Sequence, residues 1–85
     1  MTGAALTLLT REECGLCGQM QEAAVLWLAR HAPSLRLELR DVDADPVLAR
    51  RYGLRIPVLL LDGERVCEGL FDAAELDRLL RRQLA

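Results

Sequence analysis

Two cysteines three residues apart are the strongest candidates for chemistry in this sequence. Cys14 and Cys17 enclose Gly15 and Leu16 at the point where an apolar run gives way to a helical pattern. Disulfide exchange needs a thiolate nucleophile and a second thiol close enough to resolve the mixed disulfide. A spacing of three at a helix start places both sulfurs on one side, and the unpaired N–H groups there stabilise a thiolate. We therefore expect Cys14 to attack a disulfide and Cys17, one turn into the helix, to resolve it.

The other residues that could bind a metal or supply a thiol are Cys67 and His31. A structural zinc site needs four ligands, and we expect both residues at the opposite ends of their elements from the cysteine pair. A metal shared between two chains is the remaining metal alternative. Cys67 is interpreted as a small core residue, with a regulatory thiol or a third exchange partner as the alternative. His31 is interpreted as a surface residue that closes a helix.

Three aspartates at alternate positions, Asp41, Asp43 and Asp45, imitate the opening of a calcium-binding loop. Such a loop needs Gly at its sixth position and Glu at its twelfth. The sequence has Pro46 and Tyr52 at those positions. We therefore interpret the segment as a turn followed by a helix cap rather than a calcium site.

Hydrophobic periodicity predicts the elements that position the cysteine pair. The strict alternation of residues 35–40 indicates a strand near a sheet edge with one buried face, and the apolar run 56–61 indicates a strand covered on both faces. Helical spacing places four residues on one buried face of the first helix: Cys17, Met20, Ala24 and Leu28. The expected strands are residues 5–9, 35–40, 56–61 and 64–68, and the expected helices are residues 14–31, 46–53 and a last one after residue 72.

Local signals mark where several of these elements begin. Asp45 is a helix N-cap followed by Pro46 at the first helical position. A tight hairpin turn is expected at Asp62-Gly63. The last helix has Asp72 as its cap and Glu75 three residues on, as in a capping box, and its expected buried stripe is Leu76, Leu79, Leu80 and Leu84.

Length, element order and charge narrow the class of protein. Eighty-five residues form one domain, residues 1–85, and the order β-α-β-α-β-β-α predicts an α/β fold with helices on both faces of a mixed four-stranded sheet. A formal net charge of −2 with scattered arginines argues against a nucleic-acid partner.

Residues 1–9 lack the basic region of a targeting signal, and no apolar run is long enough to span a membrane. We expect a cytoplasmic monomer that binds neither nucleic acid nor membrane.

Three segments carry a resemblance to a known family. Residues 10–17 hold the cysteine pair after the first strand, the Asp-rich residues 41–46 precede the second helix, and residues 52–58 lead into the third strand. On these segments the chain resembles the glutaredoxin-like branch of the thioredoxin superfamily over nearly its whole length. The resemblance implies a thioredoxin-like α/β fold and a cis peptide bond at Ile56-Pro57 that faces the cysteine pair. In the superfamily this loop offers backbone hydrogen bonds to an extended substrate.

The resemblance also implies substrate-binding residues. Arg11 stands where glutaredoxins often carry a Lys that contacts a glutathione carboxylate. Gly69 and Asp72 resemble the segment of the family that meets the γ-glutamyl end of glutathione. From the residues alone, Arg11 also adds positive charge near the sulfur of Cys14.

The sequence departs from the family pattern between the two cysteines. Gly15 and Leu16 replace the Pro and Tyr that are usual in glutaredoxins. Leu16 adds an apolar lip that suits an extended protein segment, and Glu12 and Glu13 repel an anionic tripeptide. We therefore predict a dithiol mechanism on protein disulfides, with weak glutathione dependence.

The predicted function is that of a small dithiol–disulfide oxidoreductase, which transfers electrons from a dithiol to a disulfide. Its catalytic residues are Cys14 and Cys17, and its implied substrate-binding residues are Arg11, Ile56, Pro57, Gly69 and Asp72. The expected partners are protein disulfides or glutathione mixed disulfides. No bound cofactor is expected, and glutathione is a possible reductant. The alternatives are an adaptor that docks an extended partner without turnover, and a metal or cluster carrier that uses Cys14 with glutathione or a second chain.

Overall fold

A computed structural model describes residues 5–84, the side chain of Leu84 excepted. Residues 1–4 and 85, which belong to the predicted domain, lie outside the described part of the chain, as does the predicted burial of the Leu84 side chain. The elements follow the predicted order, with one additional 3₁₀ turn, η1. They are β1 (Leu6–Thr10), α1 (Gly15–His31), β2 (Leu37–Asp41), η1 (Val42–Ala44), α2 (Pro46–Tyr52), β3 (Val58–Leu61), β4 (Glu64–Glu68) and α3 (Ala73–Leu84).

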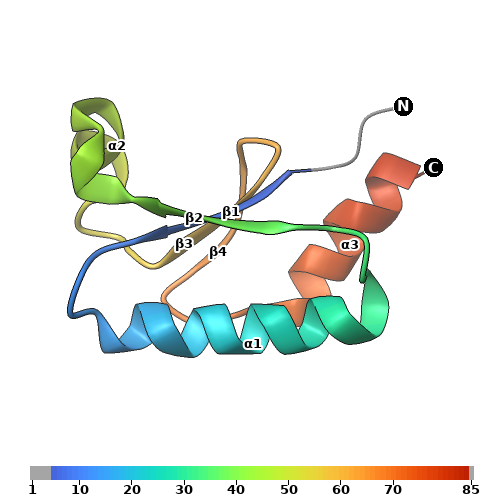
Figure 1. Ribbon diagram of the computed structural model, residues 1–85. Helices are drawn as coiled ribbons and strands as arrows, with labels where there is room; N and C mark the ends of the chain where they lie inside the picture. The colour runs from blue at the N-terminus through green and yellow to red at the C-terminus, as the bar shows by residue number, and fades with distance from the viewer. Residues whose placement is uncertain (1–4, 85) are drawn as a thin grey trace.

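The four strands form one mixed sheet in the order β2-β1-β3-β4. β1 runs parallel to β2, whereas β1–β3 and β3–β4 pair antiparallel. Figure 1 shows α1 and α3 on one side of the sheet and α2 on the other. The predicted α/β architecture, with helices on both faces of a mixed sheet, is therefore confirmed.

The predicted N-cap of the second helix and the predicted hairpin turn are both present in the structure. The carboxylate of Asp45 accepts hydrogen bonds from the N–H groups of Val47 and Leu48 at the start of α2. Asp62 and Gly63 both have positive φ, 50° and 86°, as a type I′ turn requires between two antiparallel strands. These residues are what allows β3 to return directly as β4.

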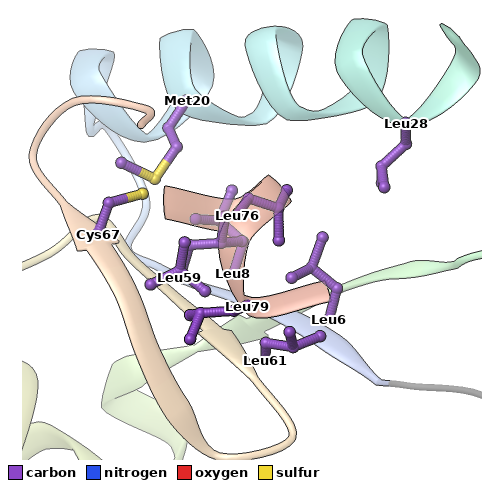
Figure 2. Packing of buried hydrophobic residues seen from close by; sticks show 10 residues of the cluster. Leu6, Leu8, Met20, Leu28, Leu59, Leu61, Cys67, Leu76 and Leu79 are labelled. Carbon is purple, nitrogen blue, oxygen red and sulfur yellow. The ribbon is translucent and has the colours of Figure 1, made fainter. Parts of the chain in front are cut away.

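Apolar side chains fill both faces of the sheet. The larger cluster lies between the sheet and helices α1 and α3, and Figure 2 shows the leucines of β1, β3 and α3 converging there. The smaller cluster lies under α2 and includes Val42, Tyr52 and Val58. Each leucine buried in this way contributes about 1.5–3 kcal/mol of hydrophobic free energy. The four residues predicted for the inner face of α1 are its buried residues, Cys17, Met20, Ala24 and Leu28.

Two local predictions are wrong in part. β2 was expected to bury one face, but Leu37 is only half-buried and Leu39 remains 49% exposed. The reason is that β2 is the edge strand, and an open groove lined by residues of α1 and β2, among them Leu28 and Leu37, borders it. The capping box of α3 is only half formed, because the Glu75 carboxylate bonds the guanidinium of Arg78 instead.

No helix within residues 5–84 is long and apolar enough to cross a membrane.

Candidate functional site

The strand register gathers the predicted site residues at one end of the sheet. Thr10 lies opposite Asp41, and Val58 lies opposite both Leu9 and Glu68. Three segments therefore lie at the same end of the sheet. They are the loop with the cysteine pair after β1, the Ile56-Pro57 segment before β3 and the Gly69 segment after β4. The carboxyl ends of strands in an open α/β sheet are where ligands bind in many folds.

The two cysteines form a disulfide across the first turn of α1. Cys14 is the N-cap residue, and its Sγ accepts a hydrogen bond from the N–H of Cys17 at 3.1 Å. A side chain that accepts from this amide normally belongs to Ser, Thr, Asp or Asn, so a sulfur takes the place of the usual capping oxygen. Cys14 is half-exposed, whereas Cys17 is only 4% exposed and packs into α1's buried face.

The residue before the pair has an unusual backbone. Glu13 has a φ of 58°, the left-handed region that costs a side-chain-bearing residue free energy relative to glycine. This conformation directs the chain from the end of β1 into α1. The Glu12 and Glu13 side chains are both exposed.

The Ile56-Pro57 peptide bond is cis, as the family resemblance implied. Pro57 is buried, and Ile56 is half-buried against the cluster under α2. The carbonyl of Pro57 accepts a hydrogen bond from the N–H of Gly69 at 2.9 Å. Gly69 itself has a φ of 80°, which glycine adopts without strain.

Arg11 lies in an internal ion pair that the sequence did not suggest. Its Nε and one terminal nitrogen donate to the two oxygens of Asp43 at 2.7 and 2.8 Å, and the other terminal nitrogen donates to the carbonyl of Gly53 at 3.0 Å. The hydrogen bond to Arg11 lowers the pKa of the Asp43 carboxyl, and the same bond raises the pKa of Arg11. The expectation that Arg11 faces a substrate carboxylate stays a prediction, but its guanidinium already has an anionic partner.

The close approach at Gly53 explains why a glycine ends α2. A Cβ at this position would clash with the carbonyl oxygen of Ala49 and stand 3.3 Å from the Arg11 guanidinium. Asp43 is thus a neighbour of Arg11 that sequence reasoning missed. The only signal was its place in the Asp-rich segment, which we had interpreted as a turn.

A second ion pair stands beside the cis proline. Arg55 donates to the carboxylate of Glu68 through Nε at 3.0 Å and through a terminal nitrogen at 2.6 Å. The bond to Arg55 lowers the pKa of Glu68. The pair joins the segment before Ile56 to the end of β4, and sequence reasoning also missed it.

The remaining predicted residues have structural contacts of their own. One oxygen of Asp72 accepts from the N–H of Glu75 at 3.0 Å, so this side chain caps α3 as predicted. Cys67 is a buried free cysteine in the larger cluster, and in Figure 2 its thiol points toward Met20. Burial raises the pKa of the Cys67 thiol, although a hydrogen bond from the backbone of Asp72 acts in the opposite direction.

His31, at the end of α1, lies against the ring of Trp27 with centroids 4.7 Å apart. Within residues 5–84, no three His, Cys, Asp or Glu side chains are grouped so that they could hold a metal ion.

Comparison with known proteins matches the chain to one family. The family described as Glutaredoxin-like domain (DUF836) matches residues 5–81. A structural-genomics target protein from X. campestris is 38% identical, with 92% of this chain and 97% of that chain covered and a TM-score of 0.63. No curated protein shows significant sequence similarity.

Two more distant structures share the fold. A protein from Nitrosomonas europaea, solved by NMR, is 23% identical with a TM-score of 0.80, and 93% of each chain is covered. The oxidised form of mitochondrial thioredoxin 3 from Saccharomyces cerevisiae is 20% identical with a TM-score of 0.64, covering 93% of this chain and 77% of that one. These likenesses confirm the predicted thioredoxin-like α/β fold.

Proposed function

The chain belongs to the glutaredoxin-like domain family, and from that premise we propose that it is a thiol–disulfide oxidoreductase that uses Cys14 and Cys17 as a dithiol. The observation that carries the proposal is the position of Cys14 at the N-cap of α1. Its sulfur accepts a hydrogen bond from the N–H of Cys17 and forms a disulfide with the sulfur of the same residue. A thiolate at that atom is stabilised by the same hydrogen bond and by the helix dipole.

The exposures of the two sulfurs support a division of roles. In the reduced protein the Cys14 thiolate attacks one sulfur of the substrate disulfide, a bond forms between them, and the other substrate sulfur leaves as a thiolate. Cys17 then attacks the Cys14 sulfur, closes the Cys14–Cys17 disulfide and releases the second substrate thiolate. Two electrons pass from the protein dithiol to the substrate, and the two thiol protons end on the two released thiols. An external thiol reductant, such as a dithiol protein or glutathione, returns the pair to its starting state.

Protein disulfides are the substrate class that the surface favours. Three leucines lie on the three segments that meet at this end of the sheet, and they are 47%, 102% and 72% exposed: Leu16, Leu54 and Leu70. An extended polypeptide can cover such side chains, whereas a small charged tripeptide leaves most of them in water. Arg11, the candidate partner for a glutathione carboxylate, is already paired with Asp43.

The experiment that tests this function follows one round of oxidation. Protein reduced and freed of reductant is mixed with insulin, quenched in acid, alkylated and mapped by mass spectrometry. One insulin disulfide should be reduced for each Cys14–Cys17 disulfide formed, while Cys67 stays a thiol. If the mixture forms no Cys14–Cys17 disulfide, or if the new disulfide includes Cys67, the proposed function is wrong.

A further inference from the structure

The charge of Arg11 is cancelled at the surface by another side chain of the protein, on the loop that leads into the cysteine pair. Arg11 is three residues before Cys14, so their Cα atoms are at most about 11 Å apart. Both carboxylate oxygens of Asp43 receive hydrogen bonds from its guanidinium. The pair therefore presents no net charge to a substrate that approaches Cys14.

The remaining charges of the loop are negative. Glu12 and Glu13 are exposed, and neither forms an ion pair or a side-chain hydrogen bond with any residue in the described part of the chain. Asp43 thus decides whether the loop carries one uncancelled cation or none. Arg55, which lies two residues before the cis proline, is paired with Glu68, where Nε and a terminal nitrogen both donate to the same carboxylate oxygen.

We propose that Asp43 is a specificity-determining residue, which excludes anionic disulfides from Cys14 by holding the Arg11 guanidinium in an internal ion pair. This inference rests on the proposed function, since it concerns which disulfides the pair reduces. A free guanidinium within about a Debye length of the reacting sulfur would attract an anionic disulfide and repel a cationic one. Asp43 removes that attraction without contacting the substrate itself.

The structure allows charge and geometry to be separated. In an Asp43→Asn variant the amide oxygen can still accept from one Arg11 nitrogen, although the amide NH2 cannot accept from the other. The hydrogen bond from Arg11 to the Gly53 carbonyl does not involve Asp43, so two of the three bonds of the guanidinium remain. The substitution therefore leaves the guanidinium in place with its charge uncancelled. Arg11→Gln does the reverse and leaves the Asp43 carboxylate uncancelled. The double variant restores a neutral pair.

The test compares three small disulfides with each variant in single-turnover reactions at low salt. The anionic substrate is dithiodiglycolate, the cationic one is cystamine, and bis(2-hydroxyethyl) disulfide is the uncharged reference. The readout is the ratio of the anionic to the cationic rate constant, in which a smaller fraction of active protein cancels. Glu38→Gln is the control for an equal change of net charge, because Glu38 is exposed on the edge strand β2 and has no ion-pair partner in residues 5–84.

The expected ratios move in opposite directions. Asp43→Asn should raise the ratio about three- to tenfold, Arg11→Gln should lower it by a similar factor, and the double variant should return to within about twofold of the starting protein. About 1 M salt should collapse all of these differences. Glu38→Gln should leave the ratio unchanged.

Failure of the proposed function and failure of the inference about Asp43 give different results with these substrates. If the unmodified protein forms no Cys14–Cys17 disulfide with any of the three disulfides or with insulin, the proposed function itself fails. If it reduces insulin but reacts with none of the three, the charge at Arg11 is not what excludes the anionic disulfide, and the inference about Asp43 is overturned. If it reacts with them but Asp43→Asn shifts the ratio no more than Glu38→Gln does, the inference about Asp43 is overturned while the function stands. Should Asp43→Asn prove unfolded by circular dichroism, the downward shift in Arg11→Gln and its salt dependence still decide the matter.

Discussion

Cys14 and Cys67 are both cysteines near the start of a helix whose backbone acts on the sulfur. The N–H of Cys17 donates to the Cys14 sulfur, and the backbone of Asp72 lowers the pKa of the Cys67 thiol. Their surroundings differ. Cys14 is half-exposed and bonded to a second sulfur, whereas Cys67 is 7% exposed, and burial raises the pKa of its thiol in spite of the amide. An amide donor alone therefore does not make an exchange site. Access to solvent and a neighbouring thiol are what separate the two regions.

The largest expected effect comes from removing the exposed sulfur. Cys14→Ser should reduce the rate of insulin reduction by on the order of 10³-fold, because the hydroxyl does not ionise near neutral pH and cannot attack a disulfide. Circular dichroism should show the fold retained, since Ser is itself a favoured N-cap residue. A Cys14→Ser protein that still reduces insulin would show that another sulfur attacks.

The next effect separates a dithiol from a monothiol mechanism. Cys17→Ser should accumulate a mixed disulfide on Cys14 and lose insulin reduction by about tenfold or more, because no second thiol remains beside Cys14 to release the substrate. The same variant is assayed on a glutathione mixed disulfide of a small thiol. If it reduces this substrate as fast as the unmodified protein, the chain works as a monothiol glutaredoxin, and the preference for protein disulfides is wrong.

The comparison predicts a different effect at the buried sulfur. Cys67→Ala should lower the free energy of unfolding by about 1–2 kcal/mol, since it leaves a small gap in the larger cluster near Met20. The insulin-reduction rate should stay within about twofold of the unmodified protein's. Denaturant unfolding measures the change in the free energy of unfolding, and the insulin assay measures the reduction rate. Loss of turnover with the fold intact would promote Cys67 to a site residue.

The smallest expected effect concerns pH. The pKa of Cys67 is raised above its ordinary value of 9.0, so between the two values the folded protein holds a proton that the unfolded chain has released. Cys67 therefore contributes stability that is present below pH 9 and is lost as the pH rises through the folded-state value. In reduced protein, stability should fall more steeply above pH 9 than in Cys67→Ala. Parallel curves would mean that Cys67 does not titrate differently in the folded state.

Local patterns predicted much of the fold. The spacing of Cys17, Met20, Ala24 and Leu28 marked the inner face of α1, and Asp45 with Pro46 marked the start of α2, because both depend on residues a few positions apart. The cysteine pair at a strand–helix junction predicted where the site lies. The cis bond at Ile56-Pro57 came from family resemblance rather than from any property of the residues.

The ion pairs that frame the site could not be predicted, because they depend on long-range geometry. Arg11 and Asp43 are 32 positions apart and meet only after β1 and β2 have paired in register. The proximity of Arg55 to Glu68 could not be predicted because β3 and β4 do not pair in a regular register. A regular ladder from the turn at residues 62–63 would place Val58 opposite Cys67, but the bulge between Leu59 and Leu60 shifts its partner to Glu68.

The central place of β1 in the sheet has a consequence for synthesis of the chain. β1 lies between β2 and β3, so the strand that leads into the cysteine pair is translated before both of its neighbours, and the second of them begins only at Val58. A ribosome that adds about 5–20 residues per second takes several seconds to cover that interval. During that time β1 has no partner on the side that β3 will occupy. The cysteine pair is therefore complete in the growing chain before the Ile56-Pro57 segment, which lies at the same end of the sheet, has been made.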